Sequence, residues 1–143
     1  MVDLADNSAG GKPVTLKAVA LRKGISKRYL ENLATQLRIA RLVLAISGRG
    51  GGYRLARSAD KITLAEILDA IMGRMSIAEC VREPQICPRA DKCPTRKVWV
   101  ALQDQILAVL GQYSLADLSE LGMDEGLFCQ SAGLMQAPGC PEA

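Results

Sequence analysis

Three cysteines lie close together in a chain that contains no histidine. Cys80, Cys87 and Cys93 fall within the stretch CVREPQICPRADKC, with six and five residues between them. Thiolates bind soft metal ions and iron-sulfur clusters, and they are the reactive form in disulfide exchange. This spacing is wider than the CxxC knuckles of zinc ribbons. The stretch is therefore a candidate metal or redox site.

The residues alone leave three kinds of site open. Structural zinc needs a closed shell of four ligands, and without histidine the fourth would be a carboxylate or a distant cysteine. Three thiolates with one exchangeable ligand suit an iron-sulfur centre whose occupancy changes. A thiol–disulfide sensor is the third possibility. Pro84, Pro88 and Pro94 make the loop rigid enough to hold thiols while leaving it open to solvent.

Composition limits the class of protein that this loop belongs to. A chain of 143 residues makes one domain with room for an appended helix, and its five cysteines are an odd number, unlike a set of disulfide staples. Aromatic residues make up only 3%, so we expect a core of Leu, Ile, Val and Ala from packed helices. No apolar run reaches the ~18 residues of a membrane span, and no signal peptide is visible. We therefore expect a soluble, cytoplasmic protein.

An enzyme is the class of protein that the sequence supports least. Acid–base chemistry has no histidine to use, and the chain shows no nucleophile motif and no paired carboxylates. We therefore expect neither catalysis nor a small-molecule substrate.

Charge is distributed unevenly along the chain. Between Lys12 and Arg57, four Lys and seven Arg face one acid, Glu31, which gives a net charge of +10. The whole chain is +3, so the remainder sums to −7, and no Lys or Arg follows Val98. A solvated basic face would explain such a segment, but a basic module joined to an acidic remainder is typical of nucleic-acid binding.

The basic segment contains the pattern of a helix-turn-helix. Thr15 is placed to cap a short helix that Gly24 ends, and Ser26 is placed to cap a second helix. The apolar residues of the second helix recur at three- and four-residue spacing: Tyr29, Leu30, Leu33 and Leu37. In this motif the second helix enters the major groove. Lys27 and Arg28 suit phosphate or guanine there, and Glu31 suits the cytosine amino group.

A β-hairpin is predicted directly after these helices. The strands LVLAIS and YRLAR flank the turn GRGGG, which makes the hairpin a wing. Its glycines let the backbone approach a phosphate, and Arg49 suits a narrow minor groove. A nucleotide-binding loop is disfavoured, because neither GK[ST] nor GxGxxG is present. The predicted DNA-contacting residues are Ser26, Lys27, Arg28, Tyr29, Glu31, Arg38, Arg49, Gly50 and Gly51.

Three further helical patterns follow the hairpin. Thr63 and Glu66 form a T-x-x-E capping box ahead of an apolar stripe. The segment RKVWVALQDQILAVLGQY places Val98, Leu102, Ile106, Val109 and Leu110 on one helical face. This face is too long to cover only a small winged domain, so we interpret it as a dimer helix that packs on its twin, with an intramolecular core helix as the alternative. Ser114 and Asp117 are placed to cap a last short helix.

From Val14 to about Leu118 the sequence resembles the Rrf2 family of bacterial winged-helix transcription regulators. The resemblance rests on GISKRYLENL, GRGGGYRLAR, ITLAEILDAI, the three cysteines, CPTRKVW and SLADL, in that order. It implies a mainly α fold with a small β-hairpin wing: a winged helix-turn-helix domain plus a long dimerisation helix. It also implies a homodimer that binds palindromic, double-stranded promoter DNA.

The resemblance further implies a cofactor. In cluster-binding members three cysteines hold an iron-sulfur cluster, so Cys80, Cys87 and Cys93 are expected to hold one, of the [2Fe-2S] type. The regulator would then sense iron-sulfur status, redox state or nitric oxide. The alternative on the same fold is a cluster-free thiol switch.

Two departures from the family pattern affect these expectations. Arg96 stands where some members have a histidine ligand, which leaves the fourth ligand open among Asp3, Asp6, Glu79, Asp91, Cys129, Cys140 and a small thiol. Members also usually begin with a basic and aromatic stretch upstream of the match, so we expect a truncated first helix, with a short variant as the alternative. The expected units are a DNA-binding domain over 1–75, a cluster loop over 76–96, the dimerisation helix with a short helix over 97–122, and a flexible tail over 123–143.

Overall fold

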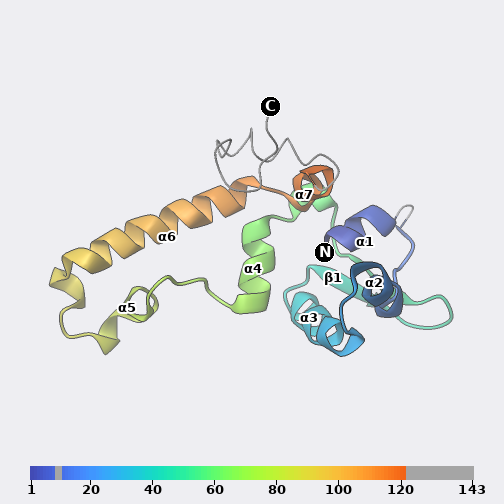
Figure 1. Cartoon of the computed structure of the whole chain (residues 1–143), viewed down its shortest axis with the longest axis horizontal. Helices are drawn as coiled ribbons and strands as arrows, with labels where there is room; N and C mark the ends of the chain where they lie inside the picture. Colours follow the sequence, from blue (N-terminus) through green and yellow to red (C-terminus); the bar gives the residue numbers. More distant parts are fainter. Residues whose placement is uncertain (9–10, 122–143) are drawn as a thin grey trace.

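The computed structural model describes residues 1–8 and 11–121. Within them the chain is mainly helical, with one antiparallel hairpin (Figure 1), which confirms the predicted fold class. The longer elements are α1 (Val2–Asn7), α2 (Leu16–Lys23), α3 (Lys27–Ile39), β1 (Val43–Ile46), β2 (Gly52–Leu55), α4 (Leu64–Met72), α5 (Glu79–Arg82), α6 (Pro94–Gln112) and α7 (Leu115–Leu121). Three short 3₁₀ turns are η2 (Ala59–Lys61), η3 (Pro84–Ile86) and η4 (Ala90–Lys92). The tail predicted over 123–143, with Cys129 and Cys140, lies outside the described residues.

The helix-turn-helix forms where the capping residues predict it. The Thr15 hydroxyl accepts a hydrogen bond from the Ala18 N–H, and the Ser26 hydroxyl accepts one from the Tyr29 N–H. Gly24 ends α2 with a φ of 64°, a left-handed conformation that glycine adopts without steric cost. The two predicted helix starts and the turn between them are therefore confirmed.

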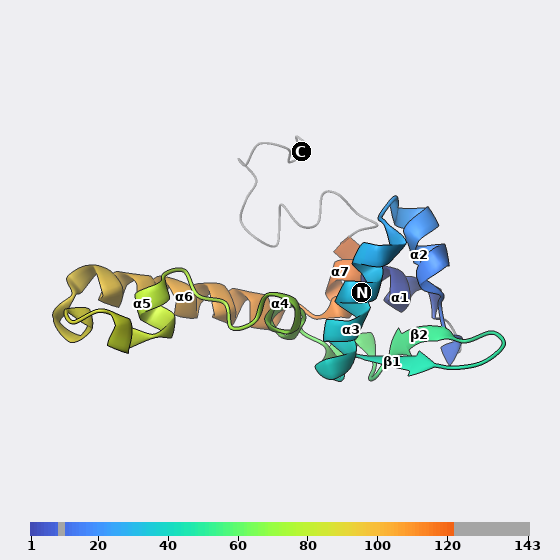
Figure 2. The same ribbon diagram turned by 90° about the horizontal axis from the view of Figure 1, so that it is seen from below.

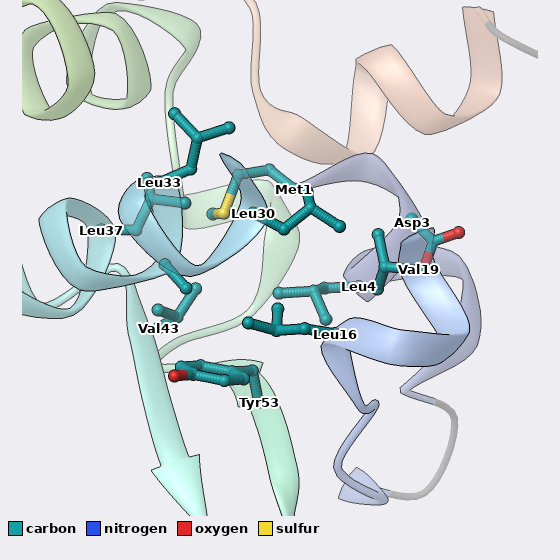
Figure 3. A pocket seen from close by; sticks show the side chains of 11 residues that line it. Met1, Asp3, Leu4, Leu16, Val19, Leu30, Leu33, Leu37, Val43 and Tyr53 are labelled. Carbon is teal, nitrogen blue, oxygen red and sulfur yellow. The ribbon is translucent and has the colours of Figure 1, made fainter. Parts of the chain in front are cut away.

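A single apolar core lies between α1, α2, α3 and the hairpin (Figure 3). The labelled side chains come from all of these elements and surround a small cavity of about 70 Å³. The hairpin joins this core through an isolated bridge, in which Val14 and Tyr53 exchange two N–H···O bonds of 2.8 Å. The helix-turn-helix and the wing are thus parts of one packed unit.

A partly buried ion pair connects α1 to α2. Arg22 donates from Nε to Asp3 Oδ1 at 2.9 Å and from Nη2 to Asp3 Oδ2 at 2.6 Å. The Asp3 side chain is buried, and its bonds to Arg22 lower the pKa of Asp3. Paired charge-assisted hydrogen bonds of this kind fix geometry as well as adding stability. Since Leu4 belongs to the same core, α1 is an integral part of the DNA-binding unit.

The C-terminal end of α6 returns to this unit. Leu64 donates its N–H to the Tyr113 carbonyl at 2.9 Å, and Leu115 donates its N–H to the Ile62 carbonyl at 2.7 Å. The Thr63–Glu66 capping box forms as predicted beside this bridge. The side chains of Ile62 and Leu115 are fully buried. We name these two backbone bonds the α4–α6 bridge.

The helix α7, predicted as the short helix that follows the dimerisation helix, packs against the DNA-binding unit. This helix packs on α1 and η2, and Ser119 hydrogen-bonds to Asp6 of α1. The reason is the burial of Leu115 in the core of the DNA-binding unit. The DNA-binding unit therefore includes a segment that is distant in sequence.

The long helix α6 extends away from the DNA-binding unit, with α4 between them (Figures 1 and 2). The segment that carries the cysteines lies along the N-terminal part of α6, at the opposite end of the molecule from the wing. Among the described residues, no helix is long and apolar enough to cross a membrane.

Candidate DNA interface and cysteine loop

The start of α3 presents polar side chains to solvent. Lys27, Arg28 and Tyr29 are all exposed in its first turn, which the Ser26 cap holds in place. The Lys27 ammonium lies 3.2 Å from the Glu31 carboxylate, one helical turn further on. Exposed pairs of this spacing are worth only about 0.3–0.5 kcal/mol, so both side chains remain available to another partner.

All eleven Lys and Arg side chains between positions 12 and 57 are exposed. Three of them, Arg22, Lys27 and Arg57, form ion pairs. The other eight have no ion-pair partner within the part of the chain that the structure describes: Lys12, Lys17, Lys23, Arg28, Arg38, Arg41, Arg49 and Arg54. Uncompensated charges of one sign produce the positive potential that attracts a polyanion. Five of these eight cations contribute to the charge of the segment but are not among the predicted DNA contacts: Lys12, Lys17, Lys23, Arg41 and Arg54.

The wing tip has a structural need for its glycines. Gly48 and Gly50 have φ values of 101° and 82°, which favour glycine. Gly51 is required for a different reason, since a Cβ there would lie 2.2 Å from the Ile46 carbonyl oxygen. The resulting turn presents Arg49 to solvent (the hairpin loop projects beyond α1 and α2 in Figure 2). The glycines of this tip therefore shape the loop, in addition to any role in admitting a phosphate.

The cysteine loop contains three free, half-buried thiols in different local settings. Cys80 lies in α5, Cys87 follows η3, and Cys93 is the N-cap of α6. The Cys93 sulfur accepts a hydrogen bond of 3.5 Å from the Arg96 N–H. The Arg96 Nε donates to the Cys80 carbonyl at 2.9 Å. Arg96 therefore joins the two ends of the loop, and its guanidinium has no lone pair to offer a metal.

The side chains of this loop are of the types that hold an iron-sulfur cluster, but the three thiols are not close enough together to hold one in this arrangement. Three thiols and no histidine are the donor chemistry of such a cluster. However, no group of three or more His, Cys, Asp or Glu side chains in the described part of the chain is close enough to hold one metal ion. The loop would have to close further to bring Cys80, Cys87 and Cys93 around a cluster.

The carboxylates considered as a fourth ligand are unequally placed. Both oxygens of Asp3 are bound by Arg22, and Asp6 pairs with Ser119, so both belong to the DNA-binding unit. Glu79 lies beside Cys80 in α5 and forms an exposed pair with Arg82. Asp91, in η4, is exposed. Of the four carboxylates considered, Glu79 and Asp91 are therefore the ones that local motion of the loop could bring to a cluster.

An uncovered apolar face runs along α6. Leu102, Ile106 and Val109 are 46%, 37% and 50% exposed, and together with Gln105 and Leu110 they line a shallow groove. Soluble monomers rarely leave a contiguous apolar stripe on a long helix in water. The residues that form it are those predicted to meet a second copy of the chain.

Comparison with known proteins gives consistent results. Residues 1–121 match the family model described as "Rrf2: Iron-dependent Transcriptional regulator". The ORF2 protein of Azotobacter vinelandii is 40% identical over 82% of this chain and 71% of the relative, and the HTH-type transcriptional regulator IscR of Xenorhabdus nematophila is 38% identical over the same shares.

Two solved structures have a similar fold. CymR, the global cysteine regulator of B. subtilis, superposes with a TM-score of 0.67 at 33% identity, over 83% of this chain and 86% of that one. IscR of T. potens superposes with a TM-score of 0.66 at 33% identity, over 85% and 78%. Both matches cover more than four fifths of this chain.

Proposed function

This chain belongs to the Rrf2 family of transcriptional regulators, and from that membership we propose that it binds palindromic, double-stranded promoter DNA as a homodimer. Its relatives and its fold are those of DNA-binding transcriptional regulators and not of enzymes. The observation that supports DNA binding most directly is the set of eight exposed cations between Lys12 and Arg57 that have no ion-pair partner among the described residues. We assign base contacts to the first turn of α3 and minor-groove contacts to Arg49. With promoter DNA as the partner, we propose that the protein acts in the cytoplasm.

The uncovered face of α6 supports the homodimer. A helix-turn-helix dimer reads two half-sites about 34 Å apart, so the two recognition helices need a rigid connection of that scale. A helix of 19 residues is about 28 Å long, which makes α6 the element of suitable length. Two copies packed along Leu102, Ile106 and Val109 would bury the apolar stripe and fix the distance between the α3 helices.

Replacing Arg28 or Arg49 with Ala is expected to weaken promoter binding by about 1–3 kcal/mol each, because each removes one cation from the interface. The loss of one cation from the interface also lowers the slope of log affinity against log salt by about one. Titration of a fluorescent promoter fragment at several salt concentrations measures both effects. Lys97→Ala, an exposed cation on α6, is the matched control. Unchanged affinity in both Arg variants would exclude the proposed α3 and wing contacts.

We propose that Cys80, Cys87 and Cys93 hold an iron-sulfur cluster, of the [2Fe-2S] type, whose state sets the affinity for DNA. The donor types, the iron-dependent family description and the IscR relatives support this proposal. When bound, such a cluster supplies an electron-accepting centre that can be lost or oxidised. In this chain Cys93 is held at the start of α6 and Cys80 is held to it by Arg96, so the order of the loop is tied to the dimer helix.

A cluster-free thiol switch is the second candidate, and a specific observation favours it. The three thiols are free and are not gathered into a metal-binding group among the described residues. One solved relative, CymR, is named a global cysteine regulator, and a structure of Staphylococcus aureus CymR is of an oxidized form. A thiol switch would respond to diamide and dithiothreitol, whereas a cluster regulator would respond to iron and sulfide.

Anaerobic purification separates these two candidates. A cluster protein is expected to be brown, with iron and acid-labile sulfide in equal amounts, and to lose both in the Cys80, Cys87, Cys93→Ala triple variant. Visible absorption and chemical analysis of iron and sulfide measure this directly. Cys80→Ala alone is expected to lower cluster content strongly, since a cluster needs all three thiolates. A protein that stays colourless after reconstitution with iron and sulfide would exclude the cluster and leave the thiol switch as the remaining candidate.

Both candidates use the same route to DNA. The cysteine loop lies on α6, α6 packs on α4, and α4 packs on α3. A change in the loop alters DNA affinity only if it stabilises one arrangement of these helices more than another. The difference in free energy between the two arrangements sets the size of the effect and is typically about 1–3 kcal/mol.

A further inference from the structure

We propose that the junction between α4, α5 and α6 is a binding site for a free α-amino acid with an apolar side chain. A half-open cavity of about 310 Å³ lies there, at the lower end of the ~300–1,000 Å³ typical of small-molecule sites. It is formed by the last turn of α4, the segment that follows Gly73, and the facing sides of α5 and α6. No cysteine lines this site, although Val81 and Arg82 follow Cys80 in α5, and the site lies outside the DNA interface.

Opposite charges line the cavity without neutralising each other. Asp69 and Arg74 both face it, and neither forms an ion pair within the described residues. Arg82 also lines it, but its guanidinium is shared with Glu79 at 3.4 Å and Glu83 at 3.3 Å. Arg74 is thus the available anchor for a carboxylate, and Asp69 is the available anchor for an ammonium group. An α-amino acid carries both charges, on two groups attached to the same carbon atom, and so offers a partner to each of these side chains.

The remaining walls of the cavity determine the kind of side chain that fits. Met75, Val81 and Leu107 line it with apolar surface. Gln103 accepts a hydrogen bond from the Ile77 N–H through its Oε1, which leaves its amide N–H groups to solvent or to a ligand. Met75, Val81 and Leu107 form the apolar part of a lining whose other residues are polar or charged, and small-molecule sites combine apolar surface with polar groups that fix the orientation of the ligand. An apolar amino acid therefore suits the cavity better than an acidic or a basic one.

The position of the cavity gives such a ligand a regulatory role. Its walls belong to the three helices that connect the cysteine loop to α3. The face of α6 that lines it, with Gln103 and Leu107, is separate from the groove formed by Leu102, Ile106 and Val109. A ligand in the cavity can therefore stabilise one arrangement of α4 and α6 without displacing a second copy of the chain.

Isothermal titration calorimetry of the full chain against the twenty L-α-amino acids tests the proposal. Saturable binding is expected for those with apolar side chains, with methionine and leucine as the first probes. The corresponding amine and acid, each lacking one charge, should bind about ten-fold more weakly or worse. Arg74→Ala and Asp69→Asn should each weaken binding by about ten-fold or more, for the same reason. Arg89→Ala, an exposed arginine of the cysteine loop, is the matched control and should bind normally.

Two results would overturn the site. One is that none of the twenty saturates the chain up to about 10 mM, and the other is that Arg74→Ala and Asp69→Asn bind as the parent does. Promoter affinity without ligand, measured on the same samples, keeps this question apart from the proposed function. If no amino acid binds but promoter binding is intact, only the proposed amino-acid site is overturned. Amino-acid binding without promoter binding would instead argue against the proposed function.

Discussion

The Leu102→Asp, Ile106→Asp double variant is expected to be a monomer that binds promoter DNA at least about 100-fold more weakly than the parent. Both side chains lie on the uncovered face of α6, which we propose to be buried between two copies. Burying an unpaired carboxylate costs several kcal/mol, so two on each copy should prevent association. A monomer reads one half-site and loses the avidity of a joined pair, which is worth about 10²–10⁴ in affinity. Analytical ultracentrifugation and promoter titration measure the two effects.

The folding of the single chain is the internal control of this experiment. Leu102 and Ile106 are exposed in the isolated chain, so the double variant should keep the helical circular dichroism of the parent. Met72→Asp, at an apolar side chain that is 70% exposed and lies outside α6, should remain dimeric. A double variant that still sediments as a dimer would show that the chain associates through another surface.

Replacing Leu115 with Ala is expected to lower the free energy of unfolding by about 2–5 kcal/mol. The Leu115 side chain is fully buried and belongs to the core of the DNA-binding unit, although it follows the long helix in sequence. Truncation leaves a cavity where α7 meets the rest of the core. Small domains are stable by only about 5–15 kcal/mol, so this loss is a large part of the total. Urea unfolding followed by circular dichroism measures it.

Leu118→Ala serves as the matched control, since it removes the same atoms from the same helix at a half-buried position. Its cost should be clearly smaller, because part of that side chain is already in water. Equal costs in the two variants would show that α7 does not depend on the burial of Leu115.

Local patterns were predictable because their causes lie within a few residues. Thr15, Ser26 and the Thr63–Glu66 pair each bond to a backbone group three positions away, so their spacing alone indicates a helix start. The hairpin was predictable for the same reason, because its glycine turn joins adjacent strands. The observed strands are shorter than the predicted ones, since pairing stops at Ile46 where the turn begins.

Contacts between distant segments were not predictable in this way. Nothing near Ser119 indicates that it pairs with Asp6, and the bonding of Arg22 to Asp3 depends on how α1 folds back on α2. The placement of Arg96 between Cys93 and the Cys80 carbonyl is also a tertiary fact. The sequence located the cysteine loop, but the closeness of its thiols depends on these long-range contacts.

The α4–α6 bridge gives the molecule the mechanics of a lever. The two backbone bonds at Ile62 and Leu64 hold one end of α6 as a fulcrum, and the arm beyond it is 19 residues, or about 28 Å, long. A tilt of about 5° at the fulcrum moves the far end of such an arm by roughly 2.5 Å. The cysteines lie at that far end. A displacement of a few ångströms at the cysteine loop therefore corresponds to a rotation of only a few degrees where α6 is attached to the DNA-binding unit. A force applied by the loop at the far end of α6 therefore exerts a large torque on the packed helices at its base.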